Sequence, residues 1–162
     1  MATLSKIAPC LWFDDQAETA AKFYTSVFDD SAITRITQFG EAGFEIHGRP
    51  AGTVMTVDFR LAGQSFTALN GGPLFKFSEA VSLMINCTTQ PEIDHYWNAL
   101  GAGGDPSAQQ CGWLKDRFGL SWQVVPTILD DLMSGPDRER AGRVMNAMLK
   151  MKKLDIAALE RA

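Results

Sequence analysis

Hydrophobic and polar positions follow the same order twice along this chain. Residues 7–13 form a short apolar run that predicts a buried strand, and residues 16–28 carry apolar side chains at helical spacing. Residues 31–39 predict a second strand, and residues 40–52 predict a loop because glycine, proline and polar residues gather there. The first part of the chain therefore predicts a strand, an amphipathic helix and a further strand.

A β-hairpin is predicted next, from the segments on either side of Ala62-Gly63. Residues 54–61 and 64–69 are separated by this pair alone, and a two-residue connection is typical of tight hairpins. The resulting register pairs Leu61 with Gln64, Phe59 with Phe66, Asp58 with Thr67, and Thr56 with Leu69. One face of the hairpin is then core and the other half polar, as expected where a sheet lines a cavity.

The second half repeats this pattern. Residues 79–85 overlay residues 7–13 as a buried strand, with Ala8 matched to Ala80, and residues 91–100 predict a helix. A second hairpin is expected from residues 111–115 and 120–125. We therefore predict an α+β fold of two tandem βαβββ modules.

Three segments make up the predicted organisation, all within one structural domain. Residues 1–73 form the first module, residues 74–131 the second, and residues 132–162 a C-terminal helical tail. The tail carries an apolar stripe formed by Val144, Met145, Met148 and Leu149, which must cover either the backs of the sheets or a partner subunit.

Charge and composition exclude several classes of function. The net charge of −4 opposes binding to nucleic acid or to an anionic membrane surface, and no apolar run is long enough to span a bilayer. The three cysteines cannot all pair and match no zinc-ligand spacing. The first six residues lack the apolar stretch of a signal peptide, so we expect a cytoplasmic protein.

Several short motifs carry a family resemblance that extends over essentially the whole chain. They are Pro9-x-Leu11-x-Phe13, Phe23-Tyr24, Leu69-Asn70-Gly71-Gly72-Pro73, residues 111–116 (CGWLKD), residues 118–126 (FGLSWQVVP) and residues 147–153 (AMLKMKK). The chain resembles the vicinal-oxygen-chelate superfamily of glyoxalase I, bleomycin-resistance proteins and extradiol dioxygenases. Within it the chain is similar to the PhnB-like branch, often labelled demethylubiquinone methyltransferases. This resemblance implies curved sheets that form a cup around the site, and a homodimer.

The resemblance also locates where a metal ion would bind. Members that chelate a metal take ligands, typically His and Glu, from the first and last strands of each module. The matching positions here are Ala8, Thr67, Ala80 and Gln123. None of these supplies an imidazole or carboxylate, so we expect no metal and no other cofactor.

The methyltransferase label requires a site for a methyl donor. A nucleotide-like donor usually binds a glycine-rich turn between a strand and a helix. The one candidate, residues 101–105 (GAGGD), follows a predicted helix and precedes Pro106, which favours a helix end and a turn.

Strand alternation defines the predicted lining of the cup. The lining side chains are aromatic, thioether, small or polar, which suits an organic ligand. They are Cys10, Trp12, Thr56, Thr67, Leu69, Ser82, Met84 and Gln123. Asp58 is the carboxylate placed among them, either as a general base or paired at a wet rim with Arg60 or Arg49.

Other reactive side chains have simpler explanations. Cys10 could act as a nucleophile, but a small core residue is the favoured interpretation. His47 and His95 have no partner at metal-ligand spacing and are interpreted as surface residues.

These observations favour a metal-independent protein that binds a small molecule. Trp12 would then stack on the ligand, while Gln123, Thr67 and Asp58 orient it. The first alternative is an enzyme acting on a small carbonyl, enol or quinone-like compound, by glyoxalase-like or methyl-transfer chemistry, with Asp58 as the base in the former case. The second alternative is a structural or interaction module whose cup is filled by its own side chains.

Overall fold

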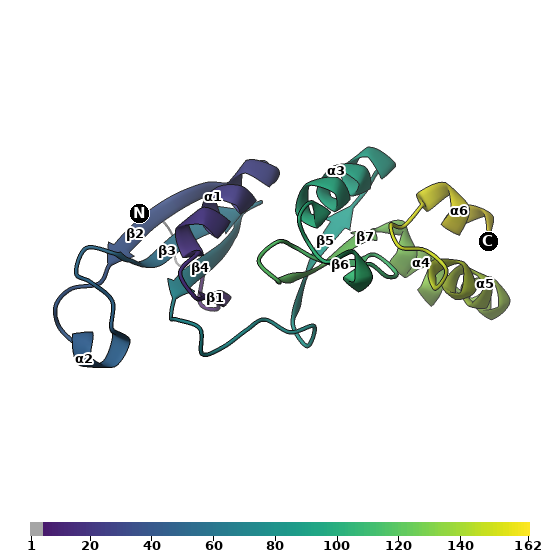
Figure 1. Ribbon diagram of the computed structural model, residues 1–162. Coiled ribbons are helices and arrows are strands. Elements are labelled where there is room, and N and C mark those ends of the chain that lie inside the picture. The colour runs from purple at the N-terminus through teal and green to yellow at the C-terminus, as the bar shows by residue number, and fades with distance from the viewer. Residues whose placement is uncertain (1–4) are drawn as a thin grey trace. The chain divides into compact units, whose positions relative to one another are not determined.

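The chain folds as two compact units, residues 1–76 and residues 77–162, in the computed structural model (Figure 1). The structure describes residues 5–162. Residues 1–4, and with them most of the segment used above to argue against a signal peptide, lie outside this range. Each unit consists of a sheet with a helix packed on one face, which confirms the predicted α+β class. Between residues 5 and 162 no helix combines the length and apolar character needed to cross a membrane.

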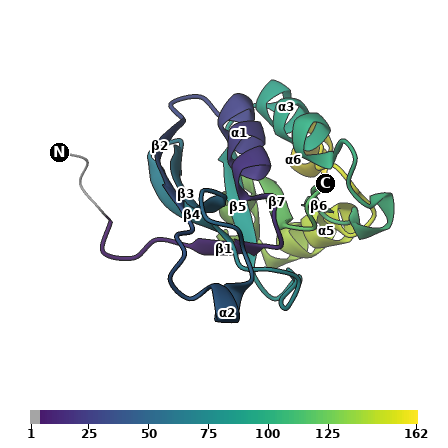
Figure 2. The same cartoon turned by 60° about the vertical axis from the view of Figure 1, so that its left-hand side comes forward.

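The first unit has the predicted strand, helix and three further strands. Its sheet has the order β1-β4-β3-β2, in which β1 is parallel to β4 and the other neighbours are antiparallel. Helix α1 lies along one face of this sheet (Figures 1 and 2). The elements are β1 (Cys10–Phe13), α1 (Ala17–Val27), β2 (Ala32–Gln38), β3 (Val54–Leu61) and β4 (Gln64–Asn70).

The hairpin of β3 and β4 has the predicted register at every pair. Ala62 and Gly63 connect the two strands with φ angles of 46° and 84°. Two successive left-handed residues give the turn a twist that matches the twist of the flanking strands, which fixes the register. Every side chain of the hairpin therefore lies on the face that the sequence indicated.

Two other elements of the first unit differ from the prediction. Strand β1 begins at Cys10, three residues later than the apolar run suggested. The predicted loop also contains a one-turn helix, α2 (Phe44–His47), between Gly43 and Gly48. Both glycines have left-handed backbone conformations, which other residues adopt only with strain, so this short helix starts and stops sharply.

The second unit has a sheet of three strands rather than four. Its order is β5-β7-β6, with β5 parallel to β7, and α3 packs on one face. The elements are β5 (Ser82–Cys87), α3 (Gln90–Gly101), the 3-10 helix η1 (Pro106–Ala108), β6 (Trp113–Lys115) and β7 (Ser121–Pro126). In the order of elements along the chain, η1 and its flanking turns occupy the place that β2 has in the first unit. The second module is therefore βαββ in the described chain.

Three helices follow the second sheet and belong to the same unit. They are α4 (Ile128–Ser134), α5 (Arg138–Met148) and α6 (Ile156–Arg161). One cluster of buried side chains joins them, made of Leu132, Val144 and Leu159 from the helices and Leu154 from the segment between α5 and α6. Val144 and Met148 of the apolar stripe therefore pack against the neighbouring helices, while Met145 and Leu149 are 36% and 53% exposed.

Residues 149–154, here called the C-terminal strap, attach these helices to the second sheet. The backbone N–H groups of Cys111 and Gly112 donate to the carbonyl oxygens of Met151 and Lys152, both at 2.8 Å. Leu154 is buried, and its side chain lies so close to Gly112 that an added Cβ would meet it at 3.1 Å. The strap is therefore an integral part of the second unit.

Candidate functional site

The first sheet has one face covered by α1 and one face that carries the predicted site residues. Leu11, Val57 and Phe59 are buried on the α1 side, together with Phe66 and Ala68. Alternation along the strands places the other side chains on the opposite face. They are Cys10, Trp12, Thr56, Asp58, Thr67 and Leu69, here called the open face of the first sheet.

A polar row crosses this open face over all four strands. Cys10 is level with Thr67, Thr67 with Asp58, and Asp58 with Arg35. The Thr67 hydroxyl donates to Asp58 Oδ1 at 2.7 Å, and Arg35 Nε donates to Asp58 Oδ2 at 2.9 Å. The Asp58 side chain is 19% exposed and the Arg35 side chain 67%. Both carboxylate oxygens are therefore engaged, and the row is held in one arrangement.

Sequence reasoning missed Arg35 as the partner of Asp58 and named Arg60 or Arg49 instead. Arg60 lies near Asp30, and Arg49 lies near Asp14. The pairing of β2 with β3 shifts register between Ile33 and Arg35, and this irregularity brings Arg35 level with Asp58. A bulge of this kind has no simple signature in the pattern of polar and apolar residues.

Trp12 lies on the same face, two residues beyond Cys10, and is level with Leu69. Its indole N–H donates to the carbonyl oxygen of Gly72 at 2.9 Å, and its ring meets Phe75 edge-on with centroids 4.9 Å apart. A Cβ on Gly71 would approach the Trp12 ring to 2.3 Å, so glycine is required at that position. The motif residues 71–72 therefore hold the indole in place.

The thiol of Cys10 lies at one end of the polar row. Partial burial raises its pKa above the ordinary value, and the Asp58 carboxylate raises the pKa further. A raised pKa keeps the thiol protonated at neutral pH, which weakens it as a nucleophile. Its side chain is nevertheless exposed, unlike the core cysteine that the sequence favoured.

The second sheet carries a related face opposite α3. Gln123 is level with Met84 on β5 and with Trp113 on β6. Its amide donates to the Ser82 hydroxyl at 2.9 Å. Met84 is 59% exposed, whereas Trp122 and Val124, which point the other way, are buried.

The strand registers correct the alignment of the two modules. Cys10, rather than Ala8, is level with Thr67, and Met84, rather than Ala80, is level with Gln123. Ala8 and Ala80 both precede their strands. The level position lies two residues beyond Ala8 in the first module and four residues beyond Ala80 in the second. Both shifts are even, so each strand residue keeps its predicted face.

The residues at these positions do not fit a divalent metal ion. Thr67 and Gln123 are neutral and already hydrogen-bonded, and the raised pKa of Cys10 opposes formation of the thiolate that a metal would need. Met84 offers only a weakly binding thioether. Among residues 5–162 no group of three or more His, Cys, Asp and Glu side chains could hold a metal ion.

Other candidates from the sequence have structural roles. His47 Nδ1 accepts a hydrogen bond from the Arg49 N–H within the α2 loop, and His95 lies on the exposed side of α3. The GAGGD segment follows the end of α3 and leads into η1, as the sequence predicted for a helix end. Gly104 is required there because a Cβ would lie 2.0 Å from the Lys115 carbonyl oxygen.

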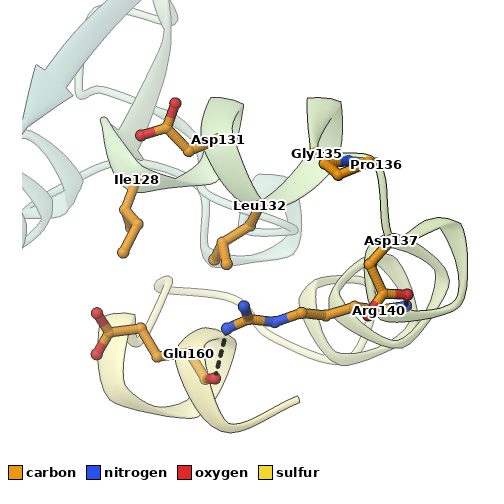
Figure 3. A pocket seen from close by; sticks show the side chains of 8 residues that line it. All are labelled: Ile128, Asp131, Leu132, Gly135, Pro136, Asp137, Arg140 and Glu160. Atoms are coloured by element: carbon orange, nitrogen blue, oxygen red, sulfur yellow. Dashed lines mark hydrogen bonds between the residues drawn. The ribbon is translucent and has the colours of Figure 1, made fainter.

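A separate cavity of about 470 Å³ lies among the C-terminal helices. Ile128 and Leu132 of α4 point into it, and Asp131 points away (Figure 3). The Arg140 guanidinium reaches across from α5 and donates to the Glu160 carbonyl oxygen at 3.1 Å. The cavity uses none of the residues of the two sheet faces.

Comparisons with known proteins match most of the chain. A family model described as 3-demethylubiquinone-9 3-methyltransferase matches residues 5–125. The chain is similar to the PhnB protein of Bacillus cereus, provisionally named a 3-demethylubiquinone-9 3-methyltransferase, with 35% identity and a TM-score of 0.64. This match covers 76% of the present chain and 100% of that protein. No curated protein matches the chain.

Two more distant structures share the fold. A protein from Pseudomonas aeruginosa is 20% identical over 76% of this chain and 98% of its own, with a TM-score of 0.57. The fosfomycin resistance protein FosX of Listeria monocytogenes is 16% identical over 81% of this chain and 96% of its own, with a TM-score of 0.50. The helices α4 to α6 begin beyond the end of the family match at residue 125.

Proposed function

Because this chain belongs to the 3-demethylubiquinone-9 3-methyltransferase family, the PhnB-like branch with the vicinal-oxygen-chelate fold, we propose that it binds a small organic molecule without a metal ion. The open face of the first sheet supplies the observation that carries this proposal. A half-buried indole stands there beside a polar row whose members hold one another in place. Aromatic surface next to a few fixed polar groups is the usual composition of a ligand site.

The residues have distinct roles in this proposal. On the first sheet, Trp12 offers an aromatic surface for stacking, and Leu69 adds apolar contact. Thr56 and Thr67 offer hydroxyl groups on the same face. The face of the second sheet, taken by itself, offers the exposed Met84 thioether and the hydrogen-bonded pair of Ser82 and Gln123. Cys10 contributes a neutral thiol rather than a nucleophile.

The geometry supports a positioning role for Asp58 more than the role of a general base. A base must approach a proton of the substrate with a free oxygen, and both oxygens of Asp58 already accept hydrogen bonds. The family name suggests methyl transfer, but the candidate segment for a methyl donor does not support it. A donor site would follow a strand, and the GAGGD segment follows a helix.

Native mass spectrometry of protein purified without added metal tests the proposal. We expect a homodimer that is free of Zn, Ni, Fe and Mn and retains an organic compound, because superfamily members often complete their site with a second subunit. A stoichiometric metal ion would overturn metal independence.

Variants connect the retained compound to the open face. Trp12→Ala should greatly lower the fraction of protein that carries the compound. Phe44→Ala, which removes an exposed ring from α2, should leave this fraction unchanged. Asp58→Asn then separates the two chemical roles. Binding weakened without any turnover supports a binding protein, and turnover abolished by this change supports an enzyme.

A further inference from the structure

A second polar row crosses the three strands of the second sheet. Ser82 is level with Ser121, and Ser121 is level with Lys115. Alternation along β7 places Ser121 on the same face as Gln123 and opposite the buried Trp122. The row therefore lies on the face that α3 leaves uncovered, next to the hydrogen-bonded pair of Gln123 and Ser82.

The hydroxyl group of Ser121 is buried without a hydrogen-bond partner among the described residues. The residue is 1% exposed. An unsatisfied buried hydroxyl is unfavourable because it has lost its hydrogen bonds to water, and folded proteins keep few such groups. An unpaired hydroxyl in the middle strand of a sheet face is explained if a bound group supplies the missing partner.

Lys115, the residue level with Ser121 on the neighbouring strand, forms an ion pair with Glu79. Lys115 Nζ lies 2.5 Å from Glu79 Oε1. Lys115 belongs to the edge strand β6, whereas Glu79 precedes the other edge strand, β5, so the pair spans the middle strand near Ser121. The Glu79 side chain is 63% exposed and that of Lys115 only 26%. The carboxylate is therefore the partner that can leave, and the ammonium group is the fixed one.

We propose that Lys115 and Ser121 bind the carboxylate group of a small organic molecule, which takes the place of the Glu79 carboxylate. The ammonium group and the hydroxyl would both donate to the incoming anion, and Gln123 and Ser82 line the adjoining surface. Exchange of one carboxylate for another leaves the net charge of the site unchanged. Because the Glu79 carboxylate is largely in contact with solvent, its displacement costs little. This inference concerns the second unit alone and goes beyond the proposed function, because it names a carboxylate as the ligand class of this sheet face.

Titration of the full-length protein with benzoate, followed by amide NMR, tests the inference. Benzamide serves as the neutral control because it has the same ring and nearly the same shape. We expect benzoate, but not benzamide, to shift the amide signals of Lys115 and Ser121. Equal shifts with both compounds, or none with benzoate, would overturn the inference.

Three variants show which groups act. Lys115→Met should weaken benzoate binding by about tenfold or more, the worth of a charge-assisted hydrogen bond. Glu79→Gln should strengthen binding by about two- to fivefold, because the internal competitor is lost. Lys152→Met removes the same charge from an exposed position and should leave binding unchanged.

Ser121→Ala separates a binding role from a structural one. The alanine removes an unsatisfied hydroxyl, so the variant should be at least as stable as the original protein while binding benzoate more weakly. A loss of stability with unchanged binding would mean that the hydroxyl serves the fold, which contradicts the inference. If an uncharged compound is retained through Trp12 and benzoate does not bind, the proposed function stands and the carboxylate site falls.

Discussion

Asp116 is a buried carboxylate of the second unit that accepts three hydrogen bonds. Its Oδ1 accepts from the backbone N–H groups of Phe118 and Leu120 at 2.8 and 3.1 Å, and its Oδ2 accepts from the indole of Trp122 at 2.9 Å. The side chain thus ties the β6–β7 turn to the core. Asp116 ends the family motif of residues 111–116, and these contacts give it a structural role in the turn.

Asp116→Asn should lower the free energy of unfolding by about 1 to 3 kcal/mol. An amide offers one oxygen, so it satisfies either the turn N–H groups or the indole and faces the other with its NH2 group. Urea denaturation followed by circular dichroism measures the change. Asp30→Asn alters an acidic residue that is 77% exposed, and should change the stability by less than about 0.5 kcal/mol.

Gly71→Ala should displace the indole of Trp12, because the new Cβ would lie 2.3 Å from the ring. Overpacking of this kind costs about 1 to 3 kcal/mol. Near-ultraviolet circular dichroism should show a changed tryptophan signal that Trp12→Phe abolishes. Gly40→Ala meets no atom within 4 Å and should leave both the signal and the stability unaltered.

Burial raises the pKa of the Cys87 thiol to about 11, from an ordinary value of 9.0. The folded state therefore holds this proton more tightly than the unfolded state, and the stabilisation is fully present below pH 9. Between pH 9 and 11 the free energy of unfolding should fall. Cys87→Ala should lose less stability over that range, whereas Ile85→Val should show the original slope with a lower starting stability. If the free energy of unfolding falls equally steeply with pH in Cys87→Ala and in the original protein, the raised pKa of Cys87 is contradicted.

At the level of single elements, the strap and α3 support each other through side chains. Gln90, at the start of α3, donates to the Leu154 carbonyl oxygen at 3.1 Å and accepts from the Ile156 N–H at 2.9 Å. Lys153 Nζ lies 2.6 Å from Asp94 Oδ1. Helix α3 and the strap therefore stabilise each other.

Leu154→Ala should reduce the free energy of unfolding by about 2 to 5 kcal/mol, since Leu154 is 1% exposed within the C-terminal cluster. Leu149→Ala is the matched control in the same strap, where the side chain is 53% exposed, and should cost less than about 0.5 kcal/mol. Equal losses in chemical denaturation would show that burial in the strap does not decide its contribution.

Sequence reasoning succeeded for elements whose boundaries are set locally. Helix α1 differs from its predicted range by one residue at each end, and the β3–β4 register follows from its two-residue turn. It failed where distant contacts decide the structure. The second module lacks a counterpart of β2, and the strap hydrogen-bonds to residues 111 and 112 near that position. Helix α4 was missed because Pro126 and Gly135 enclose only seven helical residues.

At the scale of the whole molecule, each unit has its own core. Tyr24 and Phe59 stack in the first unit with ring centroids 6.3 Å apart, and residues 1–76 contain all of its strands. In the second unit the sheet, α3 and the C-terminal helices share their contacts. Perturbation of one core should therefore remain largely within its own unit.

Hydrogen exchange measured by mass spectrometry tests this division. In Leu154→Ala, amides of β5 and β7 should exchange faster, while amides of β3 and β4 should keep their original rates. Gly71→Ala should give the reverse pattern. Faster exchange throughout the chain in either variant would show that the two units unfold together.

The position of the strap also sets an order for folding during translation. The contacts of the first unit are complete once residue 76 has left the ribosome, so that unit can fold while the rest is synthesised. The contacts of the second unit are complete only after the strap, more than twenty residues beyond β7, has emerged. A nascent chain halted before residue 149 therefore exposes backbone groups and apolar side chains that the finished protein buries. We expect chaperones to bind the chain during this interval.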